Sequence, residues 1–107
     1  MEKMDTNGKE HVLVCLSSAP SNTKIIQTAA AMAKAFNSSF TALYVKTPAS
    51  ESMTTEDAER LLSNIHFAET CGASTVTVCG DDIAFQIAEY ARLSGVTKIV
   101  IGRTVIG

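Results

Sequence analysis

The sequence predicts an α/β domain, with helices on both faces of a mostly parallel sheet. Short apolar stretches rich in β-branched residues alternate along the chain with longer stretches of helical periodicity, in the order βαβαβαβ. Parallel strands need crossovers of this length, and right-handed crossovers set the layering of the helices. The 107 residues suffice for one hydrophobic core. We therefore expect a Rossmann-like three-layer sandwich.

The first strand and helix have the clearest pattern. The apolar run "VLVCL" predicts a buried strand over residues 12–16. The following "SNTKIIQTAAAMAKAF" carries apolar residues at helical spacing and predicts a helix over residues 21–36. We expect Ser21 or Asn22 to cap its first turn and Asn37 to end it.

The middle of the chain predicts a strand, a loop and a helix. Aromatic and β-branched residues favour a second strand over residues 40–45, and the polar "TPASESM" favours a loop over residues 47–53. The second helix is expected to begin at Thr54, three residues before Asp57 as in a capping box, and to stop at Gly72. Its inward face is expected to carry Ala58, Leu61, Leu62 and Ile65.

The last third predicts two more strands around a helix. "STVTV", residues 74–78, alternates as a strand does, and "KIVIG", residues 98–102, is the fourth strand. Between them, residues 83–95 form a helix that Asp81 or Asp82 caps, because a carboxylate there satisfies free amides. The alternative use of these aspartates is a carboxylate pair. The residues expected to face inward are Ile83, Ala84, Ile87 and Ala91.

The composition argues against several classes of protein. The net charge is −2 and the 9 Lys and Arg residues are scattered, so we expect no nucleic-acid partner and no membrane surface. No apolar run approaches the ~20 residues of a membrane span, and the N-terminus lacks the apolar core of a signal peptide. We expect a soluble, cytoplasmic chain, with a flexible tail over residues 1–10 and one domain over residues 11–107.

The cysteines and histidines suggest no metal site. Cys15, Cys71 and Cys79 are odd in number and lack CxxC spacing, so we expect reduced, buried thiols. His11 and His66 have no partners at ligand spacing.

Two loops are candidates for a binding site. Ser17 and Ser18 follow the first strand, and Gly102, Arg103 and Thr104 follow or end the fourth. Open α/β sheets bind ligands at the carboxyl ends of their strands. A glycine allows close approach to the backbone, and Arg103 offers a planar fork for phosphate. The alternative is that the two serines only form or cap the loop, and that Gly102 only forms a turn beside a solvent-exposed Arg103.

The sequence contains no catalytic motif. It lacks the GxSxG elbow, the phosphate loop GxxxxGK[ST] and the dinucleotide pattern GxGxxG. Its first strand ends in serines rather than the acidic residues with which receiver domains hold magnesium. We therefore expect no catalytic residue and no enzymatic activity in this domain.

Two stretches, "VLVCLSSAPSNTKIIQTAAAMAKAFNSSFTALYV" and "CGDDIAFQIAEYARLSGVTKIVIGR", resemble the universal stress protein-like domain of the Kdp-type potassium sensor histidine kinases. The resemblance covers about residues 10–104. It implies the strand order 3-2-1-4 and the fold that universal stress proteins share with adenine nucleotide alpha hydrolases, here lacking the last helix and strand. The fourth strand is then at a sheet edge, where we expect a homodimer contact.

The resemblance also implies a regulatory role. Such a domain helps to set histidine kinase activity in response to potassium or osmotic state, so its partners are the other domains of the kinase, and a universal stress protein can be a further partner. A chain that ends soon after the fourth strand is expected to be a fragment of this larger sensor. A free-standing universal stress protein that binds adenine nucleotide is the alternative.

The resemblance disfavours ATP as the ligand. Universal stress proteins that bind ATP carry Gly-x-x-Gly after the fourth strand and an aspartate after the first. Gly102 matches the first glycine, but Val105 replaces the second and Ser17 stands at the aspartate position.

Cyclic di-AMP is the ligand that the resemblance favours. Some Kdp-type sensors are regulated by it through a Ser-x-Ser element and a later Phe-Thr-Ala-x-Tyr element. The second element is matched by Phe40, Thr41 and Tyr44. The first falls on residues 17–19, where Ala19 replaces the second serine, and Ser18 or Ser21 can supply that hydroxyl. Tyr44 is then expected near a base; a degenerate pocket kept for folding and contacts is the alternative.

Overall fold

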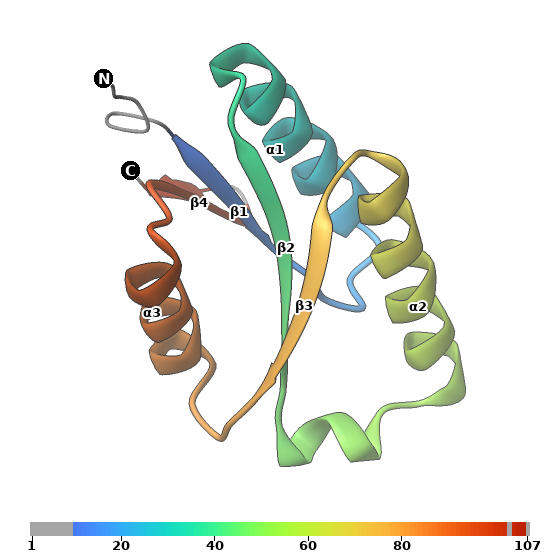
Figure 1. The fold of residues 1–107 in the computed structure, drawn as a ribbon. Coiled ribbons are helices and arrows are strands. Elements are labelled where there is room, and N and C mark those ends of the chain that lie inside the picture. Colours follow the sequence, from blue (N-terminus) through green and yellow to red (C-terminus); the bar gives the residue numbers. More distant parts are fainter. Residues whose placement is uncertain (1–9, 103, 107) are drawn as a thin grey trace.

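The structure, a computed structural model, describes residues 10–102 and 104–106 and contains one sheet between two helical layers (Figure 1). The strands are β1 (His11–Cys15), β2 (Ser39–Lys46), β3 (Ser74–Cys79), β4 (Lys98–Ile101) and β5 (Thr104–Ile106). The helices are α1 (Asn22–Phe36), α2 (Thr55–Thr70) and α3 (Ile83–Ser94), with a short 3-10 helix, η1 (Pro48–Ser52). The predicted three-layer α/β class is confirmed.

The sheet order is β3-β2-β1-β4-β5, and the first four strands are parallel. The order 3-2-1-4 is therefore confirmed. β1 lies at the centre, and Val12, Leu13 and Val14 are completely buried. An uninterrupted apolar run suits this position because side chains on both faces of the strand are covered. Residues 1–9 of the expected tail lie outside the described residues.

β5 corrects the expected end of the sheet. It pairs antiparallel with β4, Ile101 opposite Thr104, through a turn in which Gly102 has φ +53°. That conformation is easy for glycine and strained for other residues. The edge of β4 is therefore paired, so the expectation of an unpaired edge there was wrong. The homodimer itself stays a prediction. β5 has three residues, and so short a strand gives too little alternation of apolar and polar residues to be recognised in the sequence.

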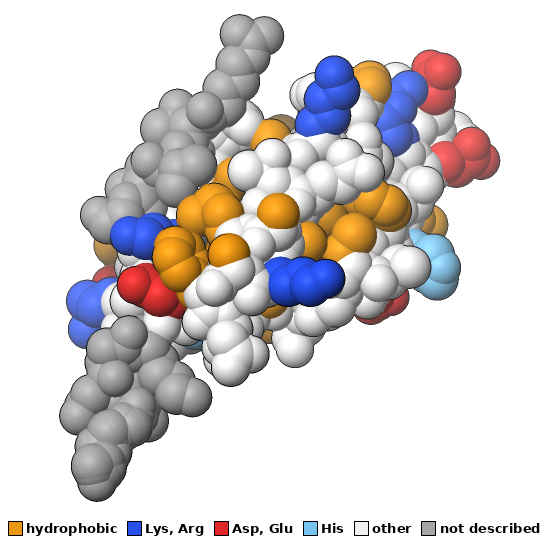
Figure 2. Space-filling model, turned by 90° about the horizontal axis from the view of Figure 1, so that it is seen from above, with side chains coloured by type: hydrophobic (Ala, Val, Ile, Leu, Met, Phe, Trp, Pro, Cys, Tyr) orange, Lys and Arg blue, Asp and Glu red, His pale blue; other side chains and the backbone are white. Residues whose placement is uncertain are grey.

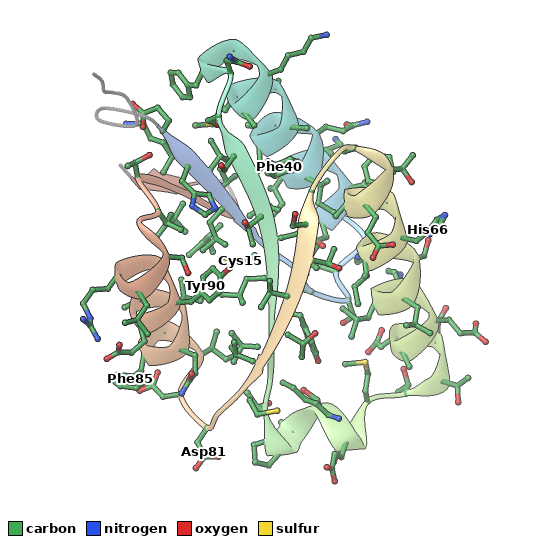
Figure 3. The ribbon with its side chains drawn as sticks, viewed as in Figure 1. Cys15, Phe40, His66, Asp81, Phe85 and Tyr90 are labelled. Atoms are coloured by element: carbon green, nitrogen blue, oxygen red, sulfur yellow. The ribbon has the colours of Figure 1, made fainter. Side chains whose placement is uncertain are left out.

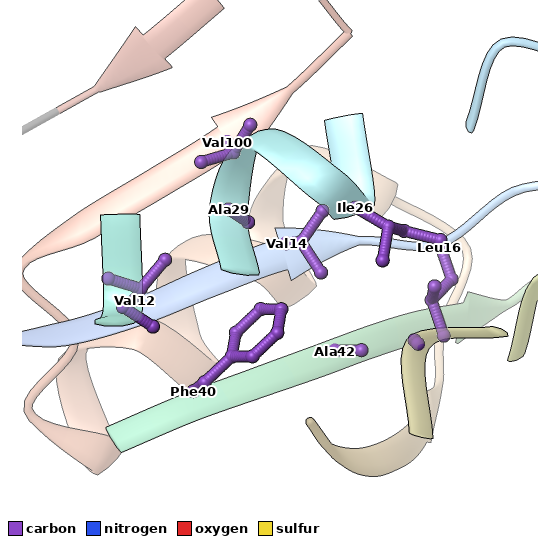
Figure 4. Packing of buried hydrophobic residues seen from close by; sticks show 10 residues of the cluster. Val12, Val14, Leu16, Ile26, Ala29, Phe40, Ala42 and Val100 are labelled. Atoms are coloured by element: carbon purple, nitrogen blue, oxygen red, sulfur yellow. The ribbon is translucent and has the colours of Figure 1, made fainter. Parts of the chain in front are cut away.

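The two faces of the sheet are buried unequally. On the face of α1 and α2, the core includes Val12, Val14, Ile26, Ala29 and Phe40 (Figure 4). On the face of α3, the buried set is smaller: Leu13, Leu43, Val45 and Ile87.

The predicted inward faces of α2 and α3 need correction. In α3, Ile87 is buried, whereas Ile83 is 52% exposed, Ala84 is exposed and Ala91 is half-buried. Fewer side chains of α3 are buried against the sheet than its apolar residues predict. In α2, Leu61 is buried, Ala58 and Ile65 are half-buried, and Leu62 is 66% exposed; the buried position is taken by Asn64.

The helix ends follow the predicted capping in most cases. The Thr54 hydroxyl accepts from the Asp57 N–H at 3.0 Å, and the Asp82 carboxylate accepts from the Phe85 N–H at 3.0 Å. Asn37 and Gly95 end their helices in the left-handed conformation, as expected. Two predictions were wrong. Neither Ser21 nor Asn22 caps α1 with its side chain, and the expected loop at residues 47–53 contains η1.

Candidate functional site

A cleft of about 560 Å³ opens at the carboxyl ends of β1 and β4. Ser17 follows β1 and Gly102 follows β4, and the structure brings both to this cleft, as the sequence predicts. We call it the serine-loop cleft, and residues 17–22 the serine loop. Its other lining residues come from the end of β1, the serine loop, the start of α1, α3 and β4: Cys15, Leu16, Ala19, Ser21, Asn22, Lys24, Ile25, Ile83, Ile87 and Ile101.

A smaller cleft of about 190 Å³ adjoins the first. The two share Cys15, Leu16, Ser17, Ile83 and Ile87. We call the smaller one the side cleft. Its own lining includes Ser18, Tyr44, Thr47, Ser50 and Met53. The Tyr44 hydroxyl donates to the Ser50 hydroxyl at 2.9 Å, which fixes the aromatic ring against η1. Ser17 thus stands where the clefts meet.

Asn22 shapes the serine loop from inside. Only 2% of Asn22 is exposed; its amide nitrogen donates to the Cys15 carbonyl at 3.1 Å, and its oxygen accepts from the Ser17 N–H at 3.2 Å. The Ser17 hydroxyl oxygen accepts from the Ala19 N–H at 3.2 Å. A hydroxyl that accepts keeps its own proton for donation. Ser17 can therefore donate to an acceptor atom of a ligand.

The charge around the serine-loop cleft is slightly positive. Among its described lining residues, Lys24 carries the one formal charge and there is no carboxylate. The first turn of α1 contains no acidic residue, so the partial positive charge of the helix N-terminus is not offset there. Lys24 was not predicted as a site residue, although its position three residues after Ser21 places it on the first turn of the helix. This cleft suits a ligand of low negative charge.

Cys15 lies at the base of both clefts. Burial raises the pKa of its thiol from 9.0 to about 11, because the low-dielectric surroundings disfavour the thiolate. The thiol is neutral at physiological pH and acts as a small apolar group. Cys71 is half-buried, and Cys79 is exposed, so the expectation of a buried thiol was wrong for Cys79. Within the described part of the chain, no cluster of potential ligands could hold a metal ion.

Two residues of the predicted "FTALY" element lie away from these clefts. Phe40 is 9% exposed and belongs to the core beside α1, near the start of β2 (Figure 3). The Thr41 hydroxyl lies 2.9 Å from His11 Nε2, at the same end of the sheet. The expected site residue Arg103 lies outside the described residues, as does the side chain of Thr104. Ser17, Ser18, Ser21, Tyr44 and Gly102 are thus the predicted residues that line the two clefts.

The chain is similar to part of a sensor protein. It is 43% identical over 94 residues, 88% of this chain, to the sensor protein KdpD of Clostridium acetobutylicum. It is 28% identical over 95 residues, 89% of this chain, to the sensor protein KdpD of Escherichia coli K12. These matches cover 10% and 11% of the relatives, so the chain spans about a tenth of their length. No family model matches.

Solved universal stress proteins have the same fold. The protein UspA of Lactobacillus plantarum gives a TM-score of 0.66 at 24% identity, covering 90% of this chain and 78% of that one. A universal stress protein solved with cAMP gives 0.64 at 18% identity, covering 89% and 77%. The protein of Archaeoglobus fulgidus solved with dAMP gives 0.59 at 19% identity, covering 88% and 81%. No helix in the described residues has the length and apolar character needed to cross a bilayer.

Proposed function

We propose that this chain, which has the universal stress protein fold and corresponds to the universal stress protein-like segment of KdpD sensor proteins, is a regulatory input domain of a sensor histidine kinase. The kinase would control potassium transport in response to potassium or osmotic state. The curated relatives are about ten times as long as the match, so the proposed partners of this domain are the other parts of such a sensor. The proposed location is the cytoplasmic side of the membrane.

The ligand we propose is an adenine nucleotide second messenger, cyclic di-AMP before ATP. The observation that carries this proposal is the composition of the serine-loop cleft, which places hydroxyls and Lys24 opposite the apolar side chains of Ile83, Ile87 and Ile101. Hydroxyls and a lysine suit the oxygens of a phosphodiester, and apolar side chains suit the face of a base. The universal stress proteins solved with cAMP and dAMP hold ligands of this chemistry.

The side cleft favours a ligand with a second base. Tyr44 lines it, and the hydrogen bond to Ser50 holds the aromatic ring in place. Base–aromatic stacking contributes ~1–3 kcal/mol by alanine substitution in single-strand binders. In ATP, three phosphates take the place of a second base, and the described lining residues offer them one cation. Cyclic di-AMP therefore fits the two clefts better than ATP.

Titration calorimetry tests the proposal on the 107-residue chain. We expect cyclic di-AMP to bind more tightly than ATP, and both Ser17→Ala and Tyr44→Ala to weaken binding. Arg103→Ala is also expected to weaken binding if its guanidinium contacts a phosphate, as its place in the sequence suggests. The matched control is Thr28→Ala, an exposed position further along α1. Tight binding that none of the site variants changes would place the ligand elsewhere.

A filter-binding assay with labelled ATP tests the prediction that this domain is not itself a kinase. We expect neither autophosphorylation nor hydrolysis of ATP. Equimolar retention of label in the presence of magnesium would show that ATP binds in spite of the incomplete glycine motif. Label from the γ-phosphate that stays on the acid-denatured protein, or release of labelled phosphate, would contradict the prediction.

The alternative is a free-standing universal stress protein that binds adenine nucleotide, which the proteins solved with cAMP and dAMP make plausible. The genomic reading frame distinguishes the two. Membrane spans and a histidine kinase core encoded after Gly107 would support the sensor, whereas a stop codon soon after that position would support the free-standing protein. If neither cyclic di-AMP nor ATP binds, docking of another protein becomes the better account of the domain.

A further inference from the structure

We infer that Asn64 and Arg60 of α2 are positioning residues that hold the serine loop in the shape that a ligand meets. The inference deepens the proposed function and rests on it for its effect on affinity. It concerns two side chains that line neither cleft. They contact the loop through its backbone carbonyls.

Of the two side chains, Asn64 makes more hydrogen bonds to the serine loop and is the more deeply buried. It lies in the middle of α2 and is 3% exposed. Its amide nitrogen donates to the Ser17 carbonyl at 2.8 Å and to the Ala19 carbonyl at 3.2 Å. These partners are 47 and 45 residues away in sequence. A buried amide that binds two carbonyls leaves them little freedom, because breaking the contacts would leave polar atoms unsatisfied.

Arg60 contacts the carbonyl of Ser18, which lies between the two residues that Asn64 contacts. Its Nη1 donates to the Ser18 carbonyl at 3.2 Å and to the Asp57 carboxylate at 3.0 Å. The carboxylate of Asp57 thus orients the guanidinium from within the same helix. Arg60 and Asn64 are four residues apart, so they lie on one face of α2. Three successive carbonyls, those of Ser17, Ser18 and Ala19, therefore accept hydrogen bonds from α2.

The direction of these carbonyls determines what the loop can offer to a ligand. A carbonyl pointing into the cleft would repel the phosphate oxygens of a nucleotide. Because α2 binds all three, the serine side chains and Lys24 form the polar part of the cleft wall. Asn22 completes the arrangement from the side of α1 by holding the Cys15 carbonyl and the Ser17 N–H. The loop is thus held by side chains from two helices.

Packing alone does not explain why an asparagine stands at position 64. On the same helix, the polar Asn64 is buried whereas the apolar Leu62 is 66% exposed, the reverse of what burial of apolar surface favours. Burying an amide costs free energy unless its hydrogen bonds are made, so an apolar side chain would serve packing alone at least as well. The hydrogen bonds to the loop are what Asn64 provides and a leucine would lack. We therefore expect a local effect on the loop in addition to any effect on stability.

The test combines hydrogen exchange with affinity in three variants. Asn64→Leu keeps the branched shape of the side chain with bulkier end groups, and removes the donors. Arg60→Ala removes the Ser18 contact at a partly exposed helix position, so it is expected to fold even if Asn64→Leu does not. The control is Ser63→Ala, exposed on the same helix. We measure amide exchange in residues 17–22 against exchange in β3, and the affinity for cyclic di-AMP under conditions where each variant is folded.

We expect exchange in the serine loop to rise about tenfold in Arg60→Ala and more in Asn64→Leu, with β3 and the control unchanged. Affinity should fall by about tenfold, and Arg60→Ala should be non-additive with Ser17→Ala because both act on one loop. Unchanged exchange in both site variants overturns the inference. Faster exchange with unchanged affinity overturns it too, since the loop would then not be positioned for the ligand. If the unsubstituted chain binds no nucleotide, the proposed function fails, and the exchange result alone decides whether α2 holds the loop.

Discussion

Among the clefts formed by the described residues, two of similar size lie at opposite ends of the sheet. The serine-loop cleft, at the carboxyl ends of the strands, measures about 560 Å³, and a second cleft at their amino ends measures about 510 Å³. We call the second the amino-end cleft. It is lined by the last turns of α1, by Phe40 and by the end of α2 at Cys71 and Gly72. Figure 2 looks onto this end of the molecule, where apolar side chains gather at the centre and basic side chains lie among them.

The difference between the clefts lies in the direction of the chain. α1 begins at the serine-loop cleft and ends at the amino-end cleft, so it presents free N–H groups to the first and carbonyl groups to the second. Each cleft has one lysine from α1, Lys24 or Lys34. Volume and formal charge therefore do not separate the two. The hydroxyls of the serine loop and the orientation of α1 favour an anion at the first cleft alone.

The largest expected effect is on stability, at Phe40. Phe40→Ala should lower the free energy of unfolding by about 3–5 kcal/mol, because a buried phenyl ring is lost. Chemical denaturation measures this. Phe40→Leu is the milder companion that should stay folded, and we expect it to bind cyclic di-AMP as the unsubstituted chain does. Weaker binding by the folded Phe40→Leu variant would mean that the ligand reaches the amino-end cleft.

Cys15 and Cys71 place one thiol in each cleft and allow a chemical comparison. With the pKa of Cys15 raised to about 11, its thiolate fraction near neutral pH is roughly 100-fold below that of a thiol with the ordinary pKa of 9.0. Alkylation by iodoacetamide, followed by mass spectrometry, should be slow at Cys15 and slower still with ligand bound. Protection of Cys71 instead of Cys15 by the ligand would reverse the assignment of the clefts.

The same pKa gives stability a defined pH dependence. In the unfolded chain the Cys15 thiol ionises near 9.0, and in the folded chain near 11. As pH rises through this window, the unfolded chain loses its proton first, so the contribution of Cys15 to stability falls. Cys15→Ser or Cys15→Ala should remove that part of the alkaline loss.

A charge reversal compares the two lysines of α1 directly. Lys24→Glu should weaken cyclic di-AMP binding by about tenfold or more, because a charge-assisted contact becomes a repulsion. Lys34→Glu is the matched control, with the same change ten residues later on the same helix. Calorimetry at two salt concentrations checks both. An equal loss in the two variants would point to a general electrostatic effect instead of a local site.

The smallest expected effect is at Tyr44. Tyr44→Phe removes the hydrogen bond to Ser50 and keeps the ring, so it should lower the free energy of unfolding by about 1 kcal/mol. Affinity should fall only slightly, because the ring that stacks on a base is still present although Ser50 no longer holds it. A large loss of affinity would show that the hydroxyl, and not the ring, contacts the ligand.

The fold was largely predictable because its signals are local. The apolar run of β1 identifies the central strand, and Thr54 and Asp82 cap the helices they precede. The serine-loop cleft followed from the general rule that parallel sheets bind ligands where strands end. Gly102 was correctly placed there for the same reason.

The rest of the site depends on contacts between residues far apart in the chain, which the periodicity of apolar residues does not predict. Phe40 and Thr41 stand together in the sequence, but strand alternation turns them to opposite faces near the amino end of β2. Tyr44, further along the same strand, reaches the side cleft. The partners of Asn64 are 45 and 47 residues away, so no local pattern identifies its role.

The most direct test of the account is a titration of the isotopically labelled chain with cyclic di-AMP, followed by amide NMR shifts. We predict that the shifts concentrate in the serine loop, at Gly102 and in the first turn of α3, while Lys34, Asn37 and Gly72 at the amino-end cleft stay unchanged. Shifts confined to the amino-end cleft, or the absence of any shift at saturating nucleotide, would contradict the claim that the serine-loop cleft is the binding site of this domain.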